Sequence, residues 1–163
     1  MKMEEQIKEI IEKTQISDLL TRYFAAVDDK RLDINIVKAT FTSEAKIIRP
    51  DDSEMIGHEN ILDGQAKSFA RFKVTHHVIT NFIVNISNDI ASLRSNIIAN
   101  HVWADNESNP ALNNKYFLAD GVFSAKAKKV DDQWRISELR NNVVWRTGDG
   151  MKEMLNFFKQ SGK

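Results

Sequence analysis

The sequence predicts an α+β fold, one domain over residues 1–163, in which helices cover the concave face of a strongly curved, cone-shaped antiparallel sheet. Apolar residues recur at helical spacing in the first part of the chain, whereas from Val74 onward they alternate as in strands. The alternating segments are roughly 13 to 15 residues long, beyond the usual length of about five or six. Strands of that length must twist and curl. A curved sheet covered by helices encloses a cavity, and its mouth is a natural ligand site.

Three helices are expected before the long strands. The first has an apolar face at 3-1-3-1-3 spacing from Ile16 to Val27, and the charged run Asp28-Asp29-Lys30 ends it. A shorter helix follows over Leu32 to Thr40. The third covers His58 to Phe69, after a short strand at residues 46–49.

Four long strands and a closing helix complete the predicted fold. The strands are expected over Val74–Ser87, Ile90–Ala104, Tyr116–Val130 and Trp134–Arg146, and the helix begins at Met151. Short Asn- and Asp-containing connections between neighbouring strands are typical of hairpin turns, which join antiparallel strands.

The composition excludes several classes of function. Lys plus Arg and Asp plus Glu number 23 each, so the formal net charge is 0. Proteins that bind nucleic acid or anionic membranes usually carry a basic excess, so neither partner is expected. The chain has no cysteine, which excludes disulfides, thiolate catalysis and cysteine-ligated zinc. It also has no apolar signal segment and no apolar run of membrane-spanning length, so we expect a cytoplasmic protein.

Alternation assigns inner and outer faces to two of the long strands. In Ile90–Ala104 the more apolar set includes Ile97 and carries His101 with it into the interior. In Tyr116–Val130 the inner set alternates aromatic with small residues, among them Phe117, Gly121 and Phe123. The small residues of this set are expected to leave room for a ligand.

The strand Val74–Ser87 has two interpretations. Its even-numbered residues are the more apolar, so alternation alone favours them as plain core. Alternatively, the half-polar odd set, which contains His77 and Ile79, lines a semi-polar pocket. His76 and His77 point to opposite faces in either case, so they cannot act together on one ligand.

Three segments together resemble the SnoaL-like proteins of the nuclear transport factor 2-like superfamily. They are Arg22-Tyr23-Phe24-Ala25-Ala26-Val27-Asp28, Thr75-His76-His77, and Gln133-Trp134-Arg135-Ile136 followed by Trp145. The branch with scytalone dehydratase and bile acid 7-alpha-dehydratase is the most similar. This resemblance also implies a cone-shaped curved sheet packed with helices.

The resemblance implies an acid–base site. It matches the helix-end aspartate of this branch to Asp28 and its strand histidine to His77, against the preference from alternation. It likewise matches a site tyrosine to Tyr23 and a second histidine to His101. Val27, Gly121 and Phe123 replace polar site residues of scytalone dehydratase. A late site arginine corresponds to either Arg140 or Arg146, and the register does not decide between them.

The function expected from these residues is a cofactor-free lyase of dehydratase type, or an isomerase. Its substrate would be a small, apolar, cyclic or polyketide-like molecule bound in the cone. One histidine held by a carboxylate can move the protons of such a reaction. Asp28, His77, Tyr23 and His101 are the candidate catalytic residues. The candidate ligand contacts are Phe24, Ile79, Ile97, Phe117, Gly121, Phe123 and Asn142.

Simpler interpretations remain open for these residues. Asp28 could only end its helix, Tyr23 could be a core residue, and the histidines could be structural. Asn141 and Asn142 could mark a bulge or offer an amide to the pocket. Asp28, His77 and His101 could also form a two-histidine, one-carboxylate metal set, but no metal and no cofactor is expected.

Two other functions compete with the enzyme. One is a binding module that holds an apolar ligand without turnover, and the other is an oligomeric interaction domain. The apolar even face of Val74–Ile86 needs a cover if the odd face lines the pocket. We therefore expect a homodimer or homotrimer.

Overall fold

The computed structural model describes residues 2–161 of the chain, with side chains over residues 2–157. Its elements follow one another as α1 (Met3–Asp28), α2 (Ile34–Thr40), β1 (Phe41–Ile48), β2 (Glu54–Ile56), α3 (His58–Phe69), β3 (Phe72–Ser87), β4 (Ile90–Trp103), a 3-10 turn (Pro110–Leu112), β5 (Tyr116–Val130), β6 (Gln133–Gly148) and α4 (Met151–Ser161). The predicted α+β class is confirmed. Within residues 2–161, no helix is long and apolar enough to cross a membrane.

The strands form a six-stranded sheet in the order β2-β1-β6-β5-β4-β3. Consecutive long strands pair as antiparallel hairpins, as expected. The expectation of a wholly antiparallel sheet was wrong at one pair, because β1 runs parallel to β6, with Ile47 opposite Leu139. A hairpin forces its two strands to be antiparallel, but β1 and β6 are far apart in the sequence and no turn fixes their relative direction.

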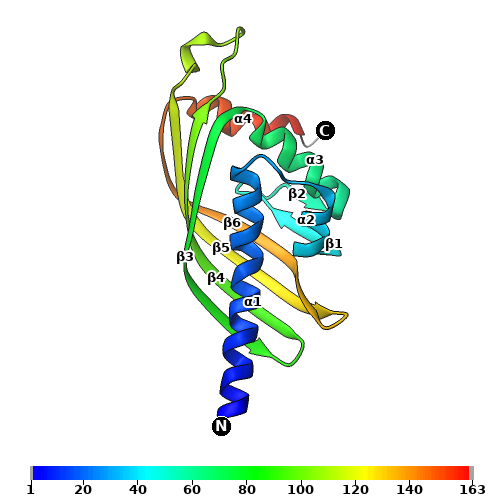
Figure 1. Cartoon of the computed structure of the whole chain (residues 1–163). Coiled ribbons are helices and arrows are strands. Elements are labelled where there is room, and N and C mark those ends of the chain that lie inside the picture. The colour runs from blue at the N-terminus through cyan, green and yellow to red at the C-terminus, as the bar shows by residue number, and fades with distance from the viewer. Residues whose placement is uncertain (1, 162–163) are drawn as a thin grey trace.

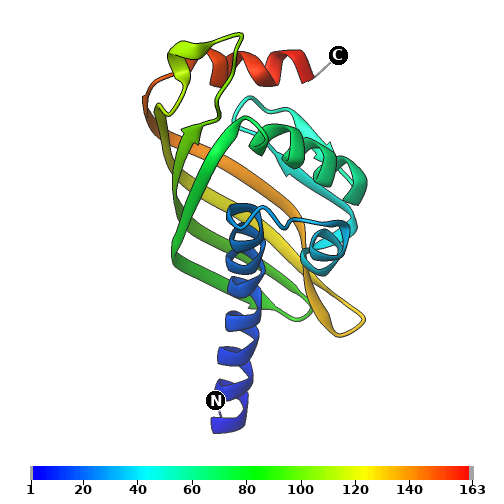
Figure 2. The same ribbon diagram turned by 45° about the horizontal axis from the view of Figure 1, so that its top comes forward.

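The sheet is strongly curved, and the helices lie toward its concave side (Figure 1). The C-terminal half of α1 packs against this face, α2 and α3 lie near β1 and β2, and α4 lies at the top of both views, beside α3 (Figure 2). The N-terminal part of α1 extends past the sheet in both views. Its apolar side chains Met3, Ile7, Ile10 and Ile11 are exposed.

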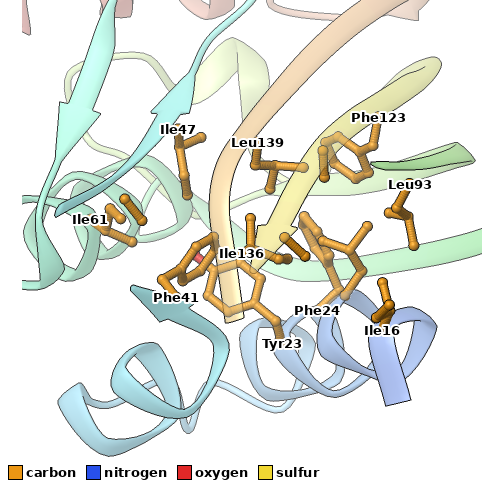
Figure 3. Packing of buried hydrophobic residues seen from close by; sticks show 14 of the residues in the cluster. Ile16, Tyr23, Phe24, Phe41, Ile47, Ile61, Leu93, Phe123, Ile136 and Leu139 are labelled. Carbon is orange, nitrogen blue, oxygen red and sulfur yellow. The ribbon is translucent and has the colours of Figure 1, made fainter. Parts of the chain in front are cut away.

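The main core fills the space between α1 and the concave face. Tyr23 and Phe24 of α1 meet Phe41, Phe123 and Ile136 from the sheet (Figure 3). The Tyr23 ring packs edge-to-face on both Phe24 and Phe41, with centroids 5.2 and 5.1 Å away. A second cluster under α4 is built on Phe72, Trp103 and Phe117. The candidate site lies where these two clusters meet.

Candidate functional site

The end of α1 and the start of β3 join through one carboxylate. The Asp28 Oδ1 atom lies 2.6 Å from Nδ1 of the His77 ring and accepts a 2.8 Å hydrogen bond from the Thr75 hydroxyl. The Asp28 Oδ2 atom accepts the backbone N–H of His77 at 2.7 Å. Burial raises the pKa of Asp28, but the hydrogen bonds from His77 and Thr75 and the charge of His77 outweigh it, so the pKa lies below its usual value. Asp28 is therefore an ionised, fully engaged acceptor that fixes the orientation of His77.

The His77 ring is buried on the inner face of the sheet. Its side chain is only 3% exposed, and it packs against Phe24 and Phe69 with centroids 4.8 and 5.5 Å away. Because Nδ1–H is donated to the carboxylate, Nε2 is the ring nitrogen left for a ligand. His76 is exposed on the outer face.

A β-bulge explains why alternation alone was misleading for β3. Asn81 has a positive φ of 55°, which asparagine tolerates better than most residues. The pairing with β4 shifts between Thr80 and Ile83, so the inward set changes parity there. Odd-numbered residues such as Thr75 and His77 face inward before the bulge, and even-numbered ones such as Val84 do so after it. The preference for the even face was therefore wrong for the half of β3 that carries the site.

A cavity of about 120 Å³ adjoins His77 on the concave side of the sheet. Four phenylalanines contribute its apolar wall: Phe24, Phe69, Phe72 and Phe123. Polar lining groups come from several parts of the fold: Arg49 after β1, Gln65 and Ser68 on α3, His101 on β4, and Asn141 and Arg146 on β6. An apolar cavity with a few polar side chains is typical of small-molecule sites.

One row of the sheet forms part of the cavity wall. His77 pairs with Ala99 on β4, Ala99 with Ala119 on β5, and Ala119 with Arg146 on β6. Paired residues in a sheet share a face, and all four residues line the cavity. The two alanines therefore leave space between a histidine at one end of the row and an arginine at the other.

His101 also lines the cavity, with its ring centroid 5.6 Å from that of His77. Its Nδ1 lies 3.1 Å from the Phe117 carbonyl oxygen, so Nδ1 carries the proton and Nε2 is an acceptor. Burial, reinforced by the charge of His77, lowers the pKa of His101 to about 4. His101 is thus neutral at pH 7 and can accept a hydrogen bond from a ligand, but it cannot supply a proton to one.

Tyr23 lies outside the cavity lining. It is fully buried, and its hydroxyl makes no well-formed hydrogen bond to any of the described residues. Burial raises the pKa of this hydroxyl well above the usual range. The nearby Gln65 side chain opposes part of that rise. The placement indicates packing between Phe24 and Phe41 rather than contact with a ligand.

Four of the seven expected ligand contacts line the cavity: Phe24, Ile97, Gly121 and Phe123. Ile79 packs instead against the main core, and Phe117 lies in the cluster under α4. Asn142 is exposed and its amide donates to the Val122 carbonyl at 3.4 Å, because strand alternation turns it away from the cavity that Asn141 lines.

The structure decides between Arg140 and Arg146, which the sequence left open. Arg146 lines the cavity, whereas Arg140 pairs with Asp52 at 2.7 Å on the exposed surface.

The strand β6 contains a bulge beside the cavity. The pairing of β5 with β6 shifts beside Gly121, which places this bulge near Val144. A Cβ on Gly121 would lie 2.4 Å from the Asn142 carbonyl oxygen. Gly121 therefore permits the close approach of β6, in addition to lining the cavity as expected.

Sequence reasoning missed four polar lining residues: Arg49, Gln65, Ser68 and Asp120. Arg49 follows the end of β1, Gln65 and Ser68 lie on α3, and Asp120 lies on β5. Within residues 2–157, no group of three or more His, Cys, Asp or Glu side chains could hold a metal ion.

Comparison with known proteins agrees with this architecture. The SnoaL-like domain family matches residues 8–140. The chain belongs to the SnoaL-like family. Among proteins with curated functions, none matches the sequence.

Solved structures of SnoaL-like shape superpose over most of this chain. Kfla4162 from Kribbella flavida has a TM-score of 0.76 at 21% identity, covering 85% of this chain and 95% of its own. The LinA-type3 hexachlorocyclohexane dehydrochlorinase from Novosphingobium barchaimii has a TM-score of 0.75 at 16% identity, covering 90% and 95%. A candidate scytalone dehydratase from Novosphingobium aromaticivorans has a TM-score of 0.74 at 16% identity, covering 87% and 90%. At these identities the likeness shows a shared fold.

Proposed function

We propose that this SnoaL-like protein is a cofactor-free lyase of dehydratase type, or an isomerase, acting on a small, apolar, cyclic or polyketide-like molecule. One observation carries the proposal: the His77 ring, held by Asp28 at 2.6 Å, forms part of the wall of an aromatic cavity. A carboxylate-oriented imidazole beside an apolar cavity is suited to proton abstraction next to a carbonyl.

In the proposed reaction, Nε2 of His77 removes a proton from the carbon next to a carbonyl. The C–H electron pair forms the new double bond, and the hydroxyl on the neighbouring carbon leaves with the proton returned by His77, as water. Asp28 stabilises the imidazolium that exists between these two transfers. In an isomerase, the same proton would return to another carbon instead.

Names of two structural relatives support an elimination. A dehydrochlorinase removes HCl and a dehydratase removes water, and both reactions take a proton and a leaving group from neighbouring carbons. His101 would accept a hydrogen bond from a substrate hydroxyl, because its Nε2 is unprotonated at pH 7.

Proton exchange tests the proposal before the natural substrate is identified. Cyclic ketones, hydroxylated steroids, naphthols and polyketide lactones would be incubated in D₂O with a chelator, and exchange or elimination followed by NMR. Wild type should catalyse one of these reactions. His77→Ala, Asp28→Asn and the double variant should lose similar activity, because each breaks the same unit.

His76→Ala is the matched control, since His76 neighbours His77 but lies on the outer face. It should keep wild-type activity. Catalysis that survives intact in His77→Ala would rule out the proposed role. Tight binding of these compounds without any exchange or elimination would favour a binding module.

We also propose that the protein assembles as a homodimer or homotrimer through the outer face of its sheet. Ile98, Val144 and Trp145 are exposed there, beside polar side chains such as Asn96 and Asn100. Mixed apolar and polar surfaces with an aromatic residue are typical of protein interfaces. A second copy covering this face would leave the concave cavity accessible.

A further inference from the structure

A second cavity adjoins the first along β3. Its volume is about 220 Å³, against about 120 Å³ for the cavity beside His77. Thr75 lines the second cavity and His77 the first. These residues face inward two positions apart on the same strand, a separation of roughly 6.6 Å. The Asp28 carboxylate accepts hydrogen bonds from both, so the second cavity directly adjoins the candidate acid–base pair.

The two cavities share two residues of α3. Gln65 and Phe69, about one helical turn apart, line both. Both are half-buried, and the Phe69 ring packs edge-to-face on His77 with the centroids 5.5 Å apart. Side chains change rotamer much faster than packed backbone segments move. A ligand in the first cavity can therefore extend into the second by displacing the Phe69 ring.

The lining of the second cavity is mostly apolar. Its apolar residues belong to the end of α1, the loop that follows, and α3 with the residue after it: Val27, Leu32, Leu62, Ala66, Phe69 and Ala70. Besides the shared Gln65, its polar residues are Thr75 and Lys30. The Thr75 hydroxyl is donated to Asp28 at 2.8 Å, and Lys30 Nζ donates to the Phe72 carbonyl at 3.4 Å. Such a lining favours an apolar occupant, because each methylene moved there from water stabilises the complex.

The size of the first cavity limits what it can hold alone. An engineered apolar cavity of about 150 Å³ binds benzene. The first cavity, at about 120 Å³, therefore has room for little more than one ring. Any further apolar part of a ligand must lie elsewhere, and the larger second cavity is its immediate neighbour.

From these observations we infer that the second cavity binds an apolar chain of the substrate, whose ring lies in the first cavity beside His77. The inference rests on the proposed function for the reaction, and it narrows the substrate class to cyclic compounds that carry an alkyl or alkenyl chain. The chain contains no reacting atom. It anchors the ring against His77 from the far side of Phe69.

A series of 4-alkylcyclohexanones tests this inference. Cyclohexanone and its 4-methyl, 4-propyl and 4-pentyl derivatives would be titrated by calorimetry, and proton exchange of the same compounds would be followed in D₂O by NMR. The affinity of wild type should rise about threefold for each added methylene, because each one leaves water. The rise should stop once the chain fills the second cavity.

Variants of Ala66 can block the second cavity from its edge. Ala66 lines that cavity but is exposed, so larger side chains there leave the core intact. Ala66→Leu and Ala66→Phe should weaken binding of the pentyl derivative by about tenfold or more, and leave the affinity for cyclohexanone unchanged. Ala25→Leu is the matched control, because Ala25 is an exposed alanine inside α1 that lines neither cavity. It should bind the whole series like wild type.

An affinity of wild type that does not rise with chain length would overturn the inference, and so would a rise unchanged in both Ala66 variants. Weaker binding of cyclohexanone itself in these variants would also overturn it, because the ring would then occupy the second cavity.

His77→Ala separates this inference from the proposed function. The variant should lose proton exchange but keep the dependence of affinity on chain length. A chain-length dependence that Ala66→Phe removes, without any His77-dependent exchange in wild type, would support the inference and reject the function. His77-dependent exchange of cyclohexanone, with no gain from the chain, would do the reverse.

Discussion

At the scale of single residues, the two inner histidines differ because their partners differ. His77 donates Nδ1–H to an ionised carboxylate, so a positive charge on its ring is stabilised. His101 donates Nδ1–H to a carbonyl in a buried, aromatic environment, where charge is disfavoured. One histidine is thus suited to taking up a proton, and the other to remaining neutral.

This difference predicts a specific acid sensitivity. In the unfolded chain His101 takes up a proton near its ordinary pKa of about 6.5, whereas in the fold it does so only at about 4. The free energy of unfolding should therefore fall by about 3 kcal/mol as the pH drops from 7 to 4. Asp28, whose pKa is lowered, contributes stability that is lost only below about pH 4.

Urea titrations at several pH values check this prediction. His101→Gln keeps a donor for the Phe117 carbonyl but does not titrate, so the stability of this variant should vary less between pH 7 and 4. His76→Gln, on the outer face, should keep the wild-type slope. An identical slope in the His101 variant would show that other groups cause the acid sensitivity.

At the scale of elements, sequence patterns located the long strands and α3 well. They failed where backbone irregularity changed the parity of a strand. Asn81 could not be identified as a bulge from alternation, because both parities of β3 contain apolar residues. Family resemblance, rather than periodicity, indicated that His77 faces inward. Arg49 and Gln65 were missed because contacts between distant elements leave no periodic signal in the sequence.

The α1 helix shows a second limit of periodicity. Ile7, Ile10 and Ile11 have helical spacing among themselves but are exposed, whereas Leu20 and Tyr23 are buried. At about 3.6 residues per turn, the early apolar residues lie on the side of α1 roughly opposite Tyr23. The spacing within each half of α1 predicted a helix. It did not show that the apolar residues of the two halves lie on different sides of that helix, one facing the core and the other facing solvent.

The β5–β6 pair provides the element-scale prediction. Gly121→Ala should destabilise the fold by about 2 kcal/mol, because the new Cβ would meet backbone atoms of β6 that cannot easily move. Ala119→Gly, two residues away on the same strand, should cost about 0.5 to 1 kcal/mol through backbone entropy alone. Chemical denaturation measures both values. A smaller loss for Gly121→Ala than for Ala119→Gly would contradict the close approach seen beside Asn142.

At the scale of the whole molecule, two of the surfaces with exposed apolar side chains are candidates for assembly. One is the outer face of the sheet, with Ile98 and Trp145, and the other is the start of α1, with Ile7 and Ile10. The outer face is the broader surface and is formed by the longest strands, so assembly is assigned to it here.

Light scattering distinguishes the two surfaces. The protein should have a mass two or three times that of the 18.7 kDa chain. Trp145→Glu should shift the mass toward a single chain, because a charge would be buried in the interface. Deletion of residues 1–10 should leave the mass of the assembly at the same multiple of the chain. A mass near 18.7 kDa at all concentrations, or dissociation only in the truncated protein, would contradict this assignment.

The extra residue at Asn81 has a consequence for how such a site arises and diverges. A single-residue deletion there would exchange the inner and outer side chains along half of a strand, whereas the same exchange by substitution would need a change at every position. Gain or loss of a histidine on the inner face of the sheet can therefore occur through chain length alone. Gap-free alignment of distant relatives would pair residues from opposite faces of this strand, so each histidine must be assigned in its structural register before a function is transferred.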